Sequence, residues 1–493
     1  MRKGFDNKKY LKLQTKEILE RVKTFNDKLY IEFGGKLFDD NHAARVLPGF
    51  DKNAKIEVLK KLSKKLEVVF VISAKDIENN KVRSDIALAY DLDVLRQMDK
   101  ISKLGILANK IVITQFEGEP KALKFKEKVE KRDIKVYIHT YTKGYPNDVE
   151  TIVSEEGYGT NPYIETEKPI VVITAPGPGS GKLATSLSQV YHEYKRGVNA
   201  SYAKYETFPV WNLPLKHPVN LAYEAATANL SDVNMIDYFH LEKYKQPSVN
   251  YNRDLEVFPV LKNILFKIAG KDIYYSPTDM GVNKVGFAIT NNDAVIEASK
   301  KEIIRRYYHH SCQNIKGLET KECAKKIEMI MGELDISPSI RKVVKKANDK
   351  FKEKKELSIA IELSNGKIIT GRNTDLMTAG ASAVINALKE MAKIKDNIHL
   401  LSPISLEPMQ KLKKQLYDNG ECLLNVIDVL TALSISEVAN PTIKLALANL
   451  PKLRNCDAHA SHMIPSNDYH AFKNIGINLS EEPQYFSKNL YEE

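Results

Sequence analysis

The sequence has few of the features that mark secreted, membrane or zinc-protease chains. It contains four cysteines (Cys312, Cys323, Cys422 and Cys456) and no CxxC pair, which suits a protein kept in a reducing cytosol. The N-terminus has no apolar signal core, and no run approaches the roughly 20 apolar residues of a membrane span. The HExxH pattern of zinc proteases is absent. We therefore expect a cytoplasmic protein with no membrane partner.

The totals are those of a globular chain with several domains. Hydrophobic residues make up 43% and charged residues 28% of 493 residues, a length that exceeds one ordinary core. The 74 basic and 63 acidic residues give a net charge of +11, which favours anionic partners in general. Because the excess is spread over a long chain, we do not expect nucleic acid as a partner.

A buried strand, a glycine-rich turn and an amphipathic helix follow one another between Lys168 and Gly197. The run Ile170–Ile173 is continuous, apolar and β-branched, as in a strand covered on both faces of a parallel sheet. The glycines after it permit positive φ and leave backbone N–H groups uncovered, next to the positive end of a helix dipole. This segment predicts a phosphate site formed by Gly177, Gly179, Ser180, Gly181, Lys182 and Thr185.

The turn departs from the standard nucleotide-binding motifs. Pro176 stands where a P-loop has its first glycine, and Leu183 stands where it has the hydroxyl that binds magnesium. Ser180 or Thr185 is the candidate replacement for that hydroxyl. Val233–Asp237 loosely resembles the strand that ends in a magnesium-binding carboxylate, although Asp237 equally fits a turn. The alternative interpretation is a tight turn that binds nothing, and Lys182 beside exposed amides favours an anion.

A second polar constellation follows the predicted strand Leu29–Phe33. Ligands of open α/β sheets bind beyond the carboxyl ends of the strands, so its position suits a site. A solvated loop is the alternative. The candidates to supply acid, base or substrate contacts are Lys36, Asp39, Asp40, His42 and Arg45.

Strands and helices alternate through the first two thirds of the chain. This order predicts doubly wound, mostly parallel, Rossmann-like α/β sheets with a P-loop-like strand, turn and helix. The Asn365-Gly366 pair predicts a hairpin in a mainly helical α+β C-terminal part. We place the domains at 1–165, 166–336 and 337–493, with Gly144–Pro169 as a connection between the first two.

The C-terminal part holds a thiol and two imidazoles at Cys456, His459 and His462, and a second set runs from His309 to Cys312. Neither spacing matches a standard zinc knuckle, so the sequence predicts no metal ligands. Cys456 with His459 or His462 is a candidate nucleophile pair, because such pairs are assembled in space.

Five segments resemble a known family over nearly the whole chain. They are EFGGKLFDDNHAARVLPGFD at 32–51, ITAPGPGSGKLATSLSQVYHEYKRG at 173–197, FPVWNLPLKHPVNLAYEAAT at 208–227, SPTDMGVN at 276–283 and LRNCDAHASH at 453–462. They are similar to the bacterial family catalogued as domain of unknown function eighteen forty-six. The resemblance implies kinship and no established activity.

Three functions follow from these patterns. The first is an enzyme that binds a nucleotide or another phosphorylated metabolite, with magnesium as the expected companion ion and phosphoryl or group transfer as the reaction. The second is a non-catalytic homo-oligomer in which the glycine turn holds a regulatory anion. The third is a transferase or hydrolase that depends on Cys456.

Overall fold

A computed structural model of the chain describes residues 3–25, 27–83, 86, 88–417 and 422–487. The chain divides into two compact units. The larger unit comprises residues 2–224 and 231–298, and the smaller unit comprises residues 225–230 and 299–493.

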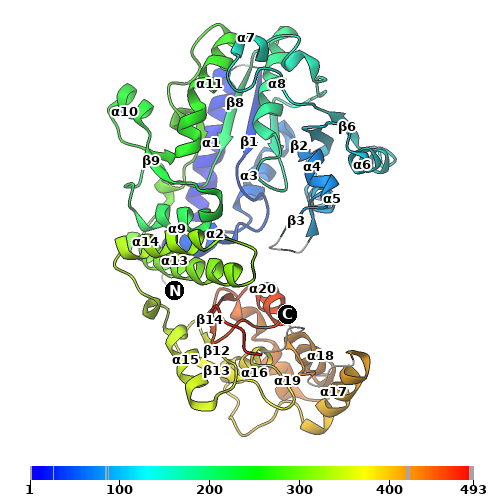
Figure 1. Cartoon of the computed structure of the whole chain (residues 1–493), viewed down its shortest axis with the longest axis vertical. Helices are drawn as coiled ribbons and strands as arrows, with labels where there is room; N and C mark the ends of the chain where they lie inside the picture. The colour runs from blue at the N-terminus through cyan, green and yellow to red at the C-terminus, as the bar shows by residue number, and fades with distance from the viewer. Residues whose placement is uncertain (1–2, 26, 84–85, 87, 418–421, 488–493) are drawn as a thin grey trace. The chain divides into compact units, whose positions relative to one another are not determined.

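The larger unit alternates strands and helices (Figure 1). Its elements are α1 (Asn7–Phe25), β1 (Lys28–Phe33), α2 (Asn41–Val46), α3 (Ala54–Leu62), β2 (Leu66–Ser73), α4 (Ala74–Glu78), β3 (Val82–Arg83), β4 (Leu88–Ala89), α5 (Tyr90–Ser102), β5 (Leu107–Thr114), α6 (Pro120–Glu130), β6 (Lys135–Ile138), α7 (Val149–Ile152), β7 (Ile170–Thr174), α8 (Lys182–Lys195), β8 (Ala200–Tyr205), α9 (Pro218–Ala226), β9 (Asn234–Ile236), α10 (Tyr238–Tyr244), β10 (Val249–Tyr251), α11 (Asn252–Ala269), α12 (Pro277–Met280) and β11 (Gly281–Val282).

Seven of these strands form one sheet in the order β11-β8-β1-β7-β2-β5-β6, and every neighbouring pair is parallel. The strand β7 is buried along its whole length because its apolar run is covered on both faces. From β1 the chain crosses over β7 to reach β2. From β7 it crosses over β1, in the opposite direction, to reach β8. The direction of winding therefore reverses between the neighbours β1 and β7.

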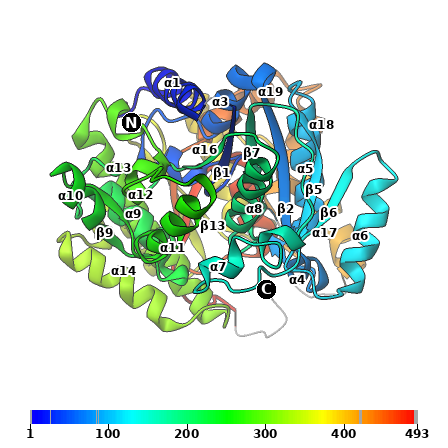
Figure 2. The same cartoon turned by 90° about the horizontal axis from the view of Figure 1, so that it is seen from above.

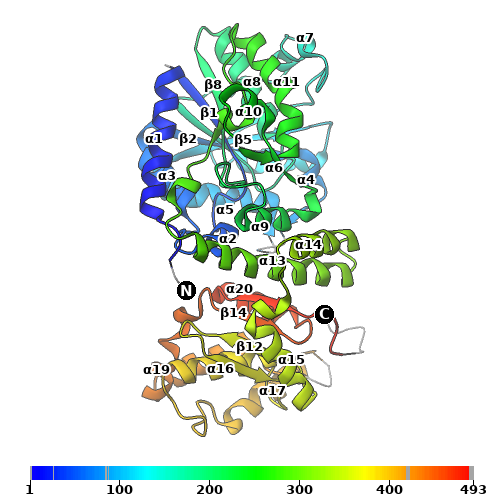
Figure 3. The ribbon, with the colours of Figure 1, turned by 90° about the vertical axis from the view of Figure 1, so that its left-hand side faces the viewer.

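Helices cover both faces of this sheet, as the mixed α/β prediction requires. Figures 2 and 3 show α1 and α3 on one face and α8 and α11 on the other. Right-handed crossovers put connections that run in opposite directions on opposite faces, which explains this division. On the α8 face, side chains of β1, β7 and β8 form a continuous core with Leu187, Val190, Phe258 and Leu261.

The structure differs from the predicted boundary between the first two domains at 165/166. Strands from both sides of that position belong to the same sheet, because β7 lies between β1 and β2. The segment Gly144–Pro169 therefore connects β6 to β7 within one unit. Its Pro and Gly content reflects a long surface connection.

The smaller unit is mainly helical around a four-stranded sheet. Its elements are α13 (Asn292–Ile315), which begins in the larger unit, α14 (Lys321–Glu333), α15 (Lys342–Lys354), β12 (Ser358–Glu362), β13 (Ile368–Arg372), α16 (Ala379–Met391), α17 (Pro403–Tyr417), α18 (Val426–Ser436), α19 (Pro441–Leu447), β14 (Asp457–Ala460), α20 (Ser466–Ile475) and β15 (Asn478–Glu481).

The sheet of the smaller unit has the order β13-β12-β14-β15. The predicted hairpin is confirmed: β12 and β13 pair in antiparallel fashion, and Gly366 takes a φ of 82° in the turn. Strand β14 pairs antiparallel with β12 and parallel with β15. Within the described residues, no helix has both the length and the apolar content needed to cross a bilayer.

Candidate functional site

The reversal of winding between β1 and β7 marks the place where open α/β sheets bind ligands. The loops that leave these two neighbouring strands pass to opposite faces of the sheet, the arrangement beside which such sheets place their ligands. The loop after β1 contains Lys36, and the loop after β7 is the glycine turn. The structure thus brings two of the predicted constellations to the same edge of the larger unit.

The glycine turn is held by close backbone packing. A Cβ atom added at Gly177 would lie 2.3 Å from the Tyr90 hydroxyl oxygen, so only glycine fits against that ring. The Ser180 hydroxyl donates to the Gly177 carbonyl at 2.9 Å, and the Thr114 hydroxyl donates to the Ser180 carbonyl at 2.8 Å. Gly181 ends the turn with a φ of 80°, a value that costs an L-residue roughly 1–2 kcal/mol.

The backbone N–H groups at the start of α8 are not used by the protein itself. Those of Gly179, Gly181, Lys182, Leu183 and Ala184 meet no hydrogen-bond acceptor in the part of the chain that the structure describes. The first turn of any α-helix leaves such groups free, and here no side chain caps them. They are the N–H groups on which the predicted phosphate site depends.

Lys182 is the first residue of α8, and its side chain, which is 13% exposed, lies beside β1. Its Nζ lies 4.0 Å from Glu32 Oε1 and makes no hydrogen bond within the described residues. Burial lowers the pKa of Lys182, with Glu32 opposing the shift. The ammonium is therefore desolvated without being fully paired.

Lys182 stands at the edge of a buried charged cluster on the α8 and α11 face. Lys204 Nζ lies 2.6 Å from Glu206 Oε1 and 2.5 Å from Asp254 Oδ2. Glu32 and Lys204 are register partners on β1 and β8, and the Tyr202 hydroxyl donates to Glu32 at 2.8 Å. The four ionic side chains and Lys182 are each less than a fifth exposed.

The environment sets the two strongest pKa shifts of this cluster in different ways. Burial raises the pKa of Glu206 to about 7, and Lys204 limits the rise. Burial acts to lower the pKa of Lys204, but Asp254 and Glu206 outweigh it and the pKa is raised. Lys204 is therefore charged at neutral pH, while Glu206 is poised between its two forms.

The two aspartates of the predicted 34–45 constellation support the loop itself. Asp40 caps α2 by accepting from the Ala43 N–H and lies 3.2 Å from Lys55 Nζ. The buried Lys55 also donates to the Gly34 and Lys36 carbonyls. Asp39 pairs with Lys52 at 2.7 Å, Lys36 is exposed, and Arg45 lies in the last turn of α2. These contacts fix the path of the chain after β1.

His42 is the member of that constellation that approaches the segment after β8. Its ring lies edge-on to Phe208 at 5.2 Å and to Tyr223 at 5.7 Å between centroids. Tyr251 donates a hydrogen bond to the Phe208 carbonyl, and Lys204 lies 5.3 Å from the centre of the Tyr251 ring. An aromatic layer thus connects His42 with the charged cluster.

The two hydroxyls considered for magnesium differ in their contacts. Ser180 is committed to the turn, whereas Thr185 Oγ1 is buried and has no hydrogen-bond partner among the described residues. Asp237 is a turn residue: it caps α10 and accepts from Thr278, and its strand β9 pairs with β10 outside the seven-stranded sheet. The resemblance to a magnesium-binding strand is therefore wrong at Asp237.

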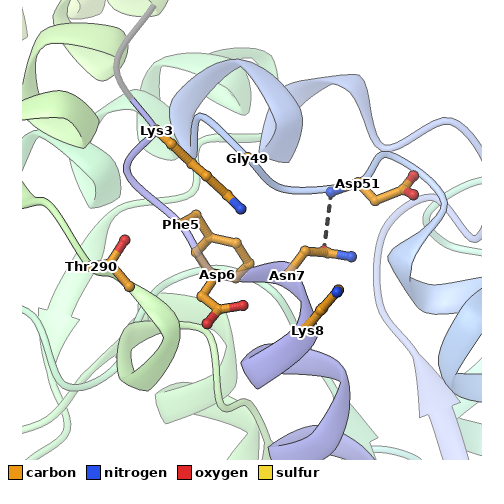
Figure 4. A pocket seen from close by; sticks show the side chains of 8 residues that line it. All are labelled: Lys3, Phe5, Asp6, Asn7, Lys8, Gly49, Asp51 and Thr290. Atoms are coloured by element: carbon orange, nitrogen blue, oxygen red, sulfur yellow. Dashed lines mark hydrogen bonds between the residues drawn. The ribbon is translucent and has the colours of Figure 1, made fainter.

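A pocket of about 580 Å³ lies at the N-terminal end of α1 (Figure 4). Its lining residues are Lys3, Phe5, Asp6, Asn7, Lys8, Gly49, Asp51 and Thr290, and the Asp51 N–H donates to the Asn7 side chain at 3.1 Å. It mixes both signs of charge, and none of the predicted site residues lines it. We assign it no function.

The smaller unit gives the predicted nucleophile pair no geometric support. Burial raises the pKa of Cys456 to about 11, and its thiol donates to the Lys452 carbonyl. The ring nitrogens of His459 lie 2.9 Å from Ser480 Oγ and 3.2 Å from Glu482 Oε1. Among the described residues, no contact joins the Cys456 thiol to an imidazole.

Sequence reasoning missed the charged cluster of Glu32, Lys204, Glu206 and Asp254. Glu32 and Lys204 lie inside runs that read as ordinary strands, and their partnership depends on β8 pairing with β1. The available signal was the presence of ionic residues in strands expected to be buried, where a charge must be paired.

Comparison with known proteins shows that the whole chain is similar to one family of bacterial proteins. Residues 3–335 match the model of "Domain of unknown function DUF1846, N-terminal", and residues 339–491 match that of "Domain of unknown function DUF1846, C-terminal". A UPF0371 protein of Clostridium botulinum strain Alaska E43 is 54% identical over 500 residues, covering 100% of this chain and 99% of the relative. A UPF0371 protein of strain Eklund 17B is 55% identical with the same coverage.

Proposed function

Because the chain belongs to the DUF1846 family, whose name records an unknown function, we propose a function from its own geometry: the larger unit binds a phosphorylated small molecule, with a nucleotide as the reference ligand. The observation that carries this proposal is the row of unused N–H groups at the start of α8, beside the largely shielded Lys182. It supports an anion at the edge of the sheet where β1 and β7 end.

The phosphate occupies the N-terminus of α8 in this proposal. Free N–H groups and the helix dipole favour negative charge there, without any side chain. Lys182 adds a cation that is largely shielded from water and lies 4.0 Å from its nearest carboxylate, Glu32. A phosphate offers this ammonium the close acceptor that the folded chain does not.

The charged cluster selects the rest of the ligand. Glu32, Glu206 and Asp254 are acceptors for hydroxyl groups, and Lys204 neutralises part of their charge. A ligand with a phosphate at one end and hydroxyl groups at the other, such as a nucleotide or a sugar phosphate, complements both halves. A bare polyphosphate without hydroxyl groups would meet carboxylates beyond the first phosphate, so it is a poorer match.

A group-transfer reaction is the second candidate, and Glu206 is the observation in its favour. A carboxylate with a pKa of about 7 is suited to accept a proton from a ligand hydroxyl at neutral pH. In this reading Glu206 is the general base and Lys182 neutralises the phosphate. Magnesium is part of the test, because Leu183 replaces the usual hydroxyl ligand and Thr185 is the available one.

The proposal is tested by titrating the intact protein with phosphate, AMP, ATP and glucose 6-phosphate, each with and without magnesium. Binding is read from the melting temperature and from calorimetry, and turnover from released phosphate. At a ligand concentration 100-fold above Kd, the expected stabilisation is about 2.7 kcal/mol.

A melting shift with phosphate release supports group transfer, and a shift without release supports a binding protein. Glycerol and uncharged glucose are the controls, since both carry hydroxyl groups and neither carries an anion. Absence of a shift with every phosphorylated ligand contradicts the proposal.

A further inference from the structure

Three metal-ligand side chains meet at the hairpin formed by α13 and α14 in the smaller unit. They are His310 near the end of α13, Glu319 in the connecting loop and Cys323 in the first turn of α14. One donor atom from each lies within 4.8 Å of the other two. No standard motif predicts this group from the sequence, because its members are separated by nine and four residues.

The loop geometry holds these side chains in place. Gly317 takes a φ of 71° and reverses the chain between the two helices. The Asn314 side chain donates to the Glu319 carbonyl at 3.0 Å, which ties the loop back to α13. His310 and Cys323 are buried, and the Glu319 side chain is only 17% exposed.

One ring nitrogen of His310 has no hydrogen-bond partner within the described residues. His310 Nδ1 lies 2.5 Å from Glu319 Oε2. His310 Nε2 is buried and finds no hydrogen-bond partner within the described residues. A buried polar atom without a partner costs free energy, which an ion bound at Nε2 would recover.

We propose that His310, Glu319 and Cys323 form a binding site for a divalent transition-metal ion, with Zn²⁺ as the ion that suits the donors best. One nitrogen, one carboxylate oxygen and one thiolate are a donor set that zinc accepts, and magnesium and calcium prefer oxygen alone. Three protein ligands leave one tetrahedral position open for water or a further ligand. The bound ion joins α13 to α14 across their loop.

Binding requires only small side-chain movements. Zinc bonds of about 2.0–2.3 Å place tetrahedral donors roughly 3.3–3.8 Å apart. The donors now lie within 4.8 Å of one another, and the 2.5 Å contact between His310 Nδ1 and Glu319 Oε2 has to open if both atoms bind the ion, so movements of about 1 Å are needed. The ion also displaces the thiol proton, so binding releases acid.

The test uses the intact chain, freed of metal by a chelator and titrated with Co²⁺ alone and then with Zn²⁺. We expect saturable binding of one cobalt ion per chain, with the absorption band of a thiolate bound to cobalt, and loss of that band when Zn²⁺ is added. Cys323→Ser removes the band and, like His310→Asn, weakens binding at least 100-fold. Glu319→Gln weakens it about 10- to 100-fold.

Matched controls use a thiol and an imidazole elsewhere in the same unit. Cys456→Ala and His399→Asn should leave the cobalt band and the affinity unchanged, because neither residue belongs to the group. If Cys323→Ser fails to fold, Glu319→Gln carries the test, since its amide keeps the shape of the carboxylate.

The proposal is overturned if the wild-type chain shows no saturable cobalt binding. A thiolate band that persists in a folded Cys323→Ser variant also overturns it, as does an equal loss in the control variants. Titration with Mg²⁺ alone should give no binding at this group, and competition by Mg²⁺ at equal concentration contradicts the donor assignment.

Discussion

Replacing Lys182 with methionine separates the proposed role of this lysine from a structural one. The side chain keeps its length and apolar body but loses its charge. A hydrogen bond to a charged group contributes about 1.5–3 kcal/mol. Its loss should weaken phosphate binding about 10- to 150-fold, measured by calorimetry at constant pH and ionic strength.

The same change should leave the unliganded protein as stable as before, or more stable. Burial lowers the pKa of Lys182, so at neutral pH the folded state bears a cost for its charge. Methionine removes this cost, and the distant contact with Glu32 at 4.0 Å offers little in return. The expected melting temperature is equal to or above that of the wild type.

Lys204→Met is the matched control within the same cluster. The raised pKa of Lys204 reflects two short ion pairs that stabilise the folded state at neutral pH, where the lysine is charged in both folded and unfolded chains. Breaking these pairs leaves the carboxylates of Glu206 and Asp254 without a cation and should lower the free energy of unfolding by about 3–5 kcal/mol. Unchanged phosphate affinity in Lys182→Met, or destabilisation equal to that of Lys204→Met, would refute the reasoning.

Four further outcomes are expected. The ratio of wild-type to Glu206→Gln phosphate affinity should fall as pH rises through about 7, because Glu206 becomes negative only in the wild type; calorimetry of both proteins from pH 6 to 8 cancels the titration of phosphate itself. Gly177→Ala should abolish phosphate binding through its clash with a ring, whereas Gly179→Ala, in open space but at positive φ, should cost only about 1–2 kcal/mol in urea unfolding. Burial raises the pKa of Glu481 to about 7, so its contribution to stability falls as pH rises from about 4.5 to 7. Glu481→Gln should flatten that part of the urea midpoint profile. Cys456 should resist alkylation at pH 8, since its pKa is about 11; rapid alkylation with parallel loss of activity would favour the thiol-dependent function instead.

The elements that local sequence could predict are those with strong, short-range signals. The apolar run that became β7 and the glycine turn after it carry their own structure, as does the Asn365-Gly366 hairpin. The helix predicted from Leu183 to Tyr194 is α8, and Gly197 follows its end at positive φ. In each case the backbone conformation depends on residues within a few positions of one another.

The order of strands in the sheet could not be predicted in the same way. The insertion of β7 between β1 and β2 depends on pairing between segments more than 90 residues apart. That insertion merges two predicted domains into one sheet and brings the loop after β1 to the same edge as the glycine turn. A single sequence carries no signal for such a pairing.

The charged side chains of the site escaped prediction for the same reason. Lys204 meets Asp254 only because α11 packs against the face of β8 on which Lys204 lies. Asp40 appeared to be a candidate acid or base, yet its carboxylate caps a helix and pairs with Lys55. Local composition identifies polar residues, whereas tertiary contacts decide which of them are available to a ligand.

The most direct test of the central claim is a crystal structure of the protein soaked in inorganic phosphate. We predict a tetrahedral anion at the start of α8, bound by the N–H groups of Gly181 and Lys182 and by Lys182 Nζ. An empty turn in a crystal soaked at saturating phosphate, with Lys182 Nζ held by Glu32 alone, would contradict the proposed site.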